Sequence, residues 1–300
     1  MKHFLVQFGS GSPGEVLGGE TEYKVLQEMN INNPAITYIP FHHLNHQTEN
    51  DWTKVLQLYQ PHTNKKIELL ELYNKNQLFY AKEILSNSDI IILGSGICEP
   101  WIQILFESGL NKHIYDCFAR GISILGYSAG GISLCDSHIT TLFFREFFLQ
   151  FNHIISSGSH SSIQNLMNSV LYEVETEFQE ELRELFLRQK PIDPLTHPLS
   201  NEVFAVTRMP ALGFLATLSV LPHFEQAPHA TTQHLWHALN RFSRYTHIGL
   251  PNGTSLFHTY SKQCLKNTIA IGHSNNPNIK ITKILKRQLI QYNEGEYIDI

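Results

Sequence analysis

The stretch ISILGYSAGG, residues 122–131, passes from an apolar run into a serine set among small residues. Ile122 to Leu125 predicts a buried strand, and a helix is expected to begin near Ala129. Ser128 then lies at a strand-to-helix turn and fits the pattern G-x-S-x-G, whose glycines let neighbouring backbone approach closely. By itself the stretch leaves two interpretations open: a nucleophile held on a sharp turn, or a small residue at an ordinary turn.

The first half of the chain alternates short apolar runs with helix-like stretches. The expected strands are Phe4–Phe8, Ala35–Ile39 (closed by Pro40), a strand within Lys66–Leu72, Asp89–Leu93 and Ile122–Leu125, and the expected helices are residues 20–29, 50–59, 77–87 and 100–118. Continuous apolar strands separated by helices are typical of a parallel sheet covered on both faces. In such α/β folds, sites form at the carboxyl ends of the strands, where we expect both Ser128 and Gly94–Gly96.

The pattern breaks between residues 142 and 206. A polar stretch at Ser156–Ser162 precedes a helical apolar period over residues 163–188. Strands are expected again at Leu218–Leu221, Thr246–Leu250, Ser255–Thr259, Thr268–Ile271 and Ile279–Ile281. We therefore expect one α/β domain over residues 1–300, with a helical insertion at residues 142–206.

Composition and charge narrow the function classes. The chain has 300 residues, 42% of them hydrophobic, which is enough for a sizeable core. Its net charge of −5 gives no electrostatic case for nucleic acid or an anionic membrane as partner. The chain has no run of 18 apolar residues, no signal-peptide pattern and no C-x-x-C pair, so we expect a cytoplasmic protein.

We expect neither a metal nor a cofactor. The histidine clusters at residues 42–46 and 234–237 lack the H-E-x-x-H pattern and have no cysteines nearby. Gly94-Ser95-Gly96 extends into neither a G-x-G-x-x-G motif nor a Walker lysine.

Two other stretches supply candidate partners for Ser128. Backbone amides at Gly94–Gly96, together with that of Ala129, can complete an oxyanion hole, although a plain glycine turn would look the same. A serine nucleophile also needs a base, and His223 ends an expected strand. The competing histidines are His138, His153 and His229.

Taken in order, these stretches resemble the dipeptidase E and cyanophycinase family of serine peptidases. The likeness is carried by Tyr38–Phe41, Ile91–Gly96, Gly126–Gly131, Ala211–Phe214, Leu221–Phe224 and Ile248–Gly253. The resemblance implies a three-layer α/β sandwich, similar to the class-I glutamine amidotransferases, with a mostly parallel central sheet. It also implies a serine peptidase that hydrolyses short peptides through a Ser-His-acid triad and an acyl-enzyme.

By this resemblance, Ser128 is the nucleophile, His223 is the general base, and the amides of Gly96 and Ala129 are the oxyanion donors. The position of the acid stays open between two glutamates. Counting forward from the serine leads to Glu146, 146 − 128 = 18 residues on, and counting back from the histidine leads to Glu202, 223 − 202 = 21 residues before it. Asp136 and Asp193 remain as further candidates, but they match neither spacing. We favour Glu202, because it precedes the segment that leads into the family-like Ala211–Phe214.

Three departures from the family pattern keep other readings open. Ile97 replaces the usual asparagine, Asn252 replaces a glutamate, and no arginine follows His223 before Arg241, so aspartyl specificity is not implied. One alternative is a catalytically impaired relative that acts as a binding or regulatory module. Another is an α/β-hydrolase esterase, which expects an H-G-G-G-type loop and a histidine near the C-terminus. The expected partner is a small peptide, and the helix at 163–188 is compatible with a homodimer.

Overall fold

The structure, a computed structural model, describes most of the chain. The described residues are 2–15, 19–41, 46–96, 98–143, 203–222, 224, 246–272, 280–285 and 288–299, with isolated positions between 152 and 196. The chain divides into two compact units. The first consists of Met1–His138, Pro210–Ala227 and Phe242–Ile300, and the second consists of Ile139–Met209 and Pro228–Arg241. The expected insertion at 142–206 falls within the second unit, largely on residues outside the described part, and stays a prediction.

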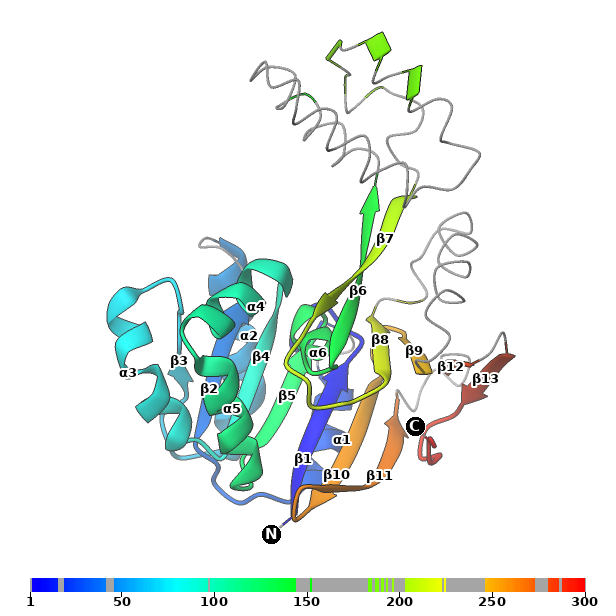
Figure 1. Cartoon of the computed structure of the whole chain (residues 1–300). Helices are drawn as coiled ribbons and strands as arrows, with labels where there is room; N and C mark the ends of the chain where they lie inside the picture. Colours follow the sequence, from blue (N-terminus) through cyan, green and yellow to red (C-terminus); the bar gives the residue numbers. More distant parts are fainter. Residues whose placement is uncertain are drawn as a thin grey trace. The chain divides into compact units, whose positions relative to one another are not determined.

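A seven-stranded sheet, in the order β11-β10-β1-β5-β4-β2-β3, forms the centre of the first unit (Figure 1). Its strands are β1 (Lys2–Phe8), β2 (Ile36–Phe41), β3 (Glu68–Leu69), β4 (Ile90–Gly96), β5 (Ser123–Tyr127), β10 (Ser255–Ser261) and β11 (Cys264–Ile271). The five strands from β1 to β3 in this order are parallel, and only β10 and β11 join in the antiparallel sense. The predicted mostly parallel sheet is confirmed.

Helices cover both faces of this sheet (Figure 1). They are α1 (Glu20–Met29), α2 (His46–Tyr59), α3 (Lys75–Ser86), α4 (Cys98–Glu107) and α5 (Leu110–Ala119), with a short 3₁₀ helix at Gln60–His62. Side chains alternate along each strand, so Val6 and Ile92 enter the core under α1 and α2, while Leu5 and Leu93 enter the core under the other helices. Burial on both faces explains the continuous apolar strands and the three layers.

Several element boundaries differ from the sequence prediction, and two of the differences have a clear local cause. The helix expected at 100–118 is two helices, because Gly109 adopts φ 68° and caps α5 in a left-handed conformation. Pro40 does not end its strand but lies inside β2, where the pairing with β4 shifts between Ile39 and Phe41. A proline lacks an amide hydrogen, and such an irregularity in the ladder accommodates it.

Two smaller sheets complete the described strands. One has four strands in the order β13-β12-β9-β8, formed by β8 (Leu218–Pro222), β9 (Thr246–Leu250), β12 (Ile281–Leu285) and β13 (Gln288–Tyr292). The other pairs β6 (Ser137–Phe143) with β7 (Val203–Pro210). The sequence analysis missed β6, β7 and β13. Strands β6 and β13 mix polar and apolar side chains, whereas the apolar run Val203–Val206 of β7 lies at the end of the stretch that was assigned to the insertion. Over the part of the chain described, no helix has the length and apolarity to cross a membrane.

Candidate active site

Ser128 lies in a strained turn between β5 and the five-residue helix α6 (Ala129–Ser133). Its backbone angles, φ 45° and ψ −108°, lie outside the regions that residues other than glycine commonly adopt, a conformation that costs roughly 1–3 kcal/mol. Its amide donates to the Phe8 carbonyl oxygen at 3.3 Å, and its carbonyl accepts from Ile132 at 2.9 Å. The residue is partly exposed, whereas Tyr127 and Ala129 on either side are buried.

The two glycines of the G-x-S-x-G pattern are required by backbone contacts. A Cβ atom at Gly126 would lie 2.5 Å from the carbonyl group of Gly130. A Cβ atom at Gly130 would lie 2.3 Å from the carbonyl oxygen of Leu93 on β4. Both distances are far inside van der Waals contact, so α6 can start directly against β4 and β5 only with glycine at these positions. These contacts are those of a nucleophile elbow.

The carboxyl end of β4 lies beside this turn, because Leu93 pairs with Gly126 across the parallel strands. Gly94 packs so closely on Tyr38 that a Cβ atom would lie 2.6 Å from the tyrosine hydroxyl. Gly96 has φ 140°, an angle that favours glycine. Gly96 and Ala129 therefore lie at the ends of adjacent strands, on the edge of the sheet that carries Ser128.

Ser95 connects this end of β4 to helix α2. Its hydroxyl donates to the carboxylate of Asp51 on α2 at 3.1 Å, and both side chains are buried. A buried carboxylate is tolerated only where hydrogen bonds satisfy it, so the contact ties β4 firmly to α2. Sequence analysis missed Asp51, because its partner Ser95 lies 44 residues away in the chain.

The segment at residues 211–215 satisfies the open end of α6. A short helix leaves its last carbonyl groups without partners inside the helix. The amides of Leu212, Gly213, Phe214 and Leu215 donate to the carbonyl oxygens of Ser133, Cys135, Leu134 and Leu134, at 2.8, 2.8, 3.1 and 3.2 Å. This segment continues into β8, so the helix that follows Ser128 is bonded to the chain that leads toward His223.

The expected base and acids fall outside the described residues. These are His223, Glu202 and Glu146, and their roles stay predictions. The residues on both sides of His223 are described: Pro222 ends β8, and Phe224 packs on β9. A Cβ atom at Gly249 would lie 2.5 Å from the Phe224 ring.

The competing histidines, His138, His153 and His229, gain no support as the base from the described structure. His138 lies in β6, whereas His153 and His229 fall outside the described part of the chain.

A buried polar cluster that sequence analysis missed lies behind Ser128. Tyr127 stacks on Phe8 with ring centroids 4.4 Å apart, and its hydroxyl lies 2.6 Å from that of Tyr59. Glu22 on α1 accepts from the Gly14 amide at 2.9 Å. Burial raises the pKa of the Glu22 carboxyl above its usual value, and hydrogen bonds from Gly14 and Tyr127 oppose this only in part.

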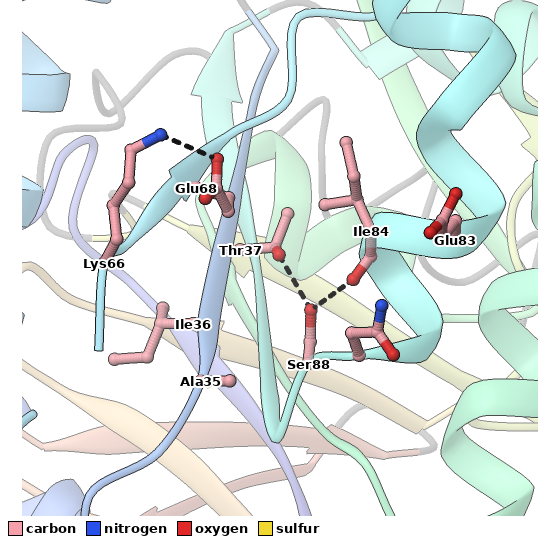
Figure 2. Close-up of a pocket in the computed structure, with 9 residues that line it drawn as sticks. Ala35, Ile36, Thr37, Lys66, Glu68, Glu83, Ile84 and Ser88 are labelled. Carbon is pink, nitrogen blue, oxygen red and sulfur yellow. Dashed lines mark hydrogen bonds and ion pairs between the residues drawn. The ribbon is translucent and has the colours of Figure 1, made fainter.

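One pocket in the described structure lies away from this edge (Figure 2). It has a volume of about 240 Å³ and is lined by residues that include Ala35, Ile36 and Glu68. Thr37 and Ser88, which also line it, pair their hydroxyls at 2.7 Å. Because it borders the amino end of β2, it is at the wrong edge of a parallel sheet for the active site. The described residues contain no group of three His, Cys, Asp or Glu side chains that could hold a metal ion.

The glycine contacts predict a graded effect on stability. Gly130→Ala should destabilise the protein by about 1–3 kcal/mol, because the new methyl group must push α6 away from β4. Gly131→Ala is the matched control: its Cβ atom would lie 3.0 Å from the nearest atom, the Gly126 oxygen, so a smaller loss is expected. Urea unfolding followed by circular dichroism measures both. Gly130→Ala with wild-type stability would contradict the described packing.

The raised pKa of Glu22 predicts a pH-dependent variant. The folded protein holds this proton more tightly than the unfolded chain, so the carboxyl lowers stability as the pH rises from its usual pKa of 4.5 through the folded pKa. Glu22→Gln should therefore gain stability relative to wild type as the pH rises above 4.5. Thermal unfolding over this rise in pH measures the difference, with the exposed Glu28→Gln on the same helix as control for the lost charge. A difference that does not change with pH would argue against the buried carboxyl.

Known proteins give two kinds of match. Residues 12–147, which include Ser128 and Gly96, match Peptidase family S51. No curated protein sequence matches the chain. Among solved structures, a peptidase from an acI-B1 Actinobacterium superposes with a TM-score of 0.62 at 16% identity, covering 100% of this chain and 98% of its own. A putative Peptidase E protein from Listeria monocytogenes EGD-e superposes with a TM-score of 0.50 at 15% identity, covering 91% and 100%.

At these identities the structural matches show the fold, and the family match over residues 12–147 supports the class of enzyme. The match covers the strands and turns that build the elbow, and it confirms the predicted resemblance to the dipeptidase E and cyanophycinase family. Over residues 12–147 the chain is thus similar in sequence to Peptidase family S51, and its fold is similar to that of the two peptidase structures, which together support a serine-type peptidase.

Proposed function

We propose that the chain hydrolyses short peptides, with Ser128 as nucleophile and His223 as general base. The observation that carries the proposal is the strained conformation of Ser128, at φ 45° and ψ −108°. Strain of this kind persists only where the surrounding structure enforces it, and it concentrates at functional sites. An ordinary turn would not require a non-glycine residue in this conformation between two glycines at which a Cβ atom would clash with neighbouring backbone.

The proposed reaction follows from these roles. The Ser128 hydroxyl oxygen attacks the peptide carbonyl carbon, and its proton passes to His223. The amides of Gly96 and Ala129 stabilise the negative oxygen of the tetrahedral intermediate. The C–N bond then breaks as His223 returns the proton to the leaving amine. Water, deprotonated by His223, attacks the acyl-enzyme and releases the carboxylic acid with Ser128 restored.

The local amides are the source of oxyanion stabilisation in this proposal. A macrodipole is the sum of many aligned peptide units, and α6 has only five residues. The placement of Gly96 at the end of β4 and of Ala129 after Ser128 favours these two amides, because β4 and β5 are hydrogen-bonded neighbours. Gly96 also has a φ of 140°, which leaves its backbone free to adopt an orientation that other residues disfavour.

We propose Glu202 as the acid that orients His223, with Glu146 as the alternative. The hydrogen bonds between residues 211–215 and α6 favour the first, because they attach the chain that follows Glu202 to the helix next to Ser128. The substrate class, short peptides, comes from the family resemblance and from the name Peptidase E borne by one structural relative. Aspartyl specificity is not proposed, since the arginine-bearing segment expected after His223 is absent from the sequence.

Covalent labelling tests the nucleophile. A fluorophosphonate probe reacts with an activated serine, so the wild-type protein should be labelled and Ser128→Ala should not be. Mass spectrometry of the labelled peptide identifies the modified residue. Wild-type protein that stays unlabelled would favour the impaired binding module over the peptidase, and labelling at another serine would exclude Ser128 as the nucleophile.

The acid is tested by a matched pair of amide variants. Glu202→Gln should reduce the rate of labelling or peptide hydrolysis by roughly 10⁴-fold, because an amide cannot stabilise the charged imidazole. Glu146→Gln should have little effect. The reverse pattern would move the assignment to Glu146, and two near-wild-type variants would exclude both.

A further inference from the structure

A buried chain of polar side chains runs from the outer strands of the sheet to α6. Gln7 on β1 donates from Nε2 to the Gly131 carbonyl oxygen at 2.7 Å, and its Oε1 lies 3.2 Å from Nε2 of His258 on β10. The other ring nitrogen of His258, Nδ1, lies 2.9 Å from Oγ1 of Thr268 on β11. Gln7 and His258 are 0% exposed and Thr268 is 2% exposed, so water does not compete for these bonds.

The Gly131 carbonyl, at the α6 end of this series of polar groups, determines the direction of every hydrogen bond in the series. The Gly131 carbonyl can only accept, so the Gln7 amide nitrogen faces it and Oε1 faces the histidine. Because Oε1 also only accepts, Nε2 of His258 carries the proton. Nδ1 then accepts from the Thr268 hydroxyl. Desolvation lowers the pKa of His258 to about 3, so the neutral ring persists at physiological pH.

Gln7 acts on the same short turn that carries Ser128. Its neighbour Phe8 accepts the Ser128 amide at 3.3 Å, and Gln7 itself binds the carbonyl of Gly131, three residues after the serine. The second hydrogen of the Gln7 amide points to Sγ of Cys135, at 3.5 Å, just beyond the end of α6. Strand β1 therefore contacts the turn and the helix after it at three points: the Ser128 amide, the Gly131 carbonyl and Sγ of Cys135.

We propose that Gln7 is a positioning residue for Ser128, held in its orientation by His258. The inference rests on the proposed role of Ser128 as nucleophile. An apolar side chain would fill the same space in β1, between Val6 and Phe8, without the cost of a buried amide. The polar chain instead aims a donor at one carbonyl of α6, and this fixes the helix, and with it the Oγ of Ser128, against the strained turn. Small displacements of a reacting group reduce rates steeply.

The test separates the rate of the covalent step from stability. Gln7→Met has similar volume but donates nothing to Gly131. We expect kinact for a fluorophosphonate to fall roughly 10- to 100-fold, with KI changed less than about twofold, because the serine is misplaced while the pocket remains. Thr37→Val is the matched control. It removes the buried hydrogen bond between the hydroxyls of Thr37 and Ser88, whose oxygens lie 2.7 Å apart near the amino end of β2, away from Ser128 (Figure 2). It should lower the melting temperature and leave kinact unchanged.

Conservative variants add a second readout. His258→Gln keeps a donor near the position of Nε2, so it should lose less in kinact than His258→Leu. If Gln7→Met does not fold, Gln7→Asn gives the same test, because its side chain is one methylene too short to span Gly131 and His258.

Three results would overturn the inference. A Gln7 variant whose folded fraction reacts within about twofold of the wild-type rate excludes a positioning role, given the steep dependence expected. So does an equal fall in kinact for Thr37→Val, which would show general destabilisation. Wild-type protein that is not labelled at Ser128 would overturn the proposed function and this inference with it, whereas the first two results leave the proposed function standing.

Discussion

The close approach of three backbone segments, without side chains between them, is the constraint on which the site depends. Gly126, the next-to-last residue of β5, lies against the carbonyl of Gly130, and Gly130, the second residue of α6, lies against the carbonyl of Leu93 on β4. With these gaps closed, the residue between the glycines must turn through a conformation that serine tolerates poorly. The parallel pairing of β4 with β5 then brings Gly96 to the same edge as Ser128. The strand order, the spacing of the glycines and the strained conformation of Ser128 therefore all follow from the same close packing of backbone.

Segments far apart in the sequence stabilise this arrangement. Strand β1 supplies the Phe8 carbonyl to the amide of Ser128, and Gln7 reaches the carbonyl of Gly131. Residues 212–215 bond to the end of α6 and the two residues after it, although the bonded pairs are at least 78 positions apart in the chain (213 − 135 = 78). Residues 211–215 thus lie next to the helix that follows Ser128, and they lead into β8, which ends one residue before the proposed base His223.

The central sheet and the elbow could be predicted because their signals are local. Continuous apolar runs mark strands buried on both faces, and glycines around Ser128 mark a turn with no room for side chains. Other features depend on pairings that a single sequence does not contain. Gln7 and His258 are 251 positions apart, and only the antiparallel register of β1 with β10 brings them together. The left-handed Gly109 splits a helix whose apolar period runs on without a break. The proposed acid stays open between Glu146 and Glu202 for the same reason, since counting along the chain gives two answers.

The most direct measurement is a crystal structure of the wild-type protein after reaction with a fluorophosphonate. The account predicts phosphorus bonded to Oγ of Ser128, with one phosphoryl oxygen within hydrogen-bond distance of the amide nitrogens of Gly96 and Ala129. It also predicts that His223 lies next to the adduct, with one carboxylate behind it. An adduct on another residue, or a phosphoryl oxygen directed away from both amides, would contradict the elbow as the centre of the reaction.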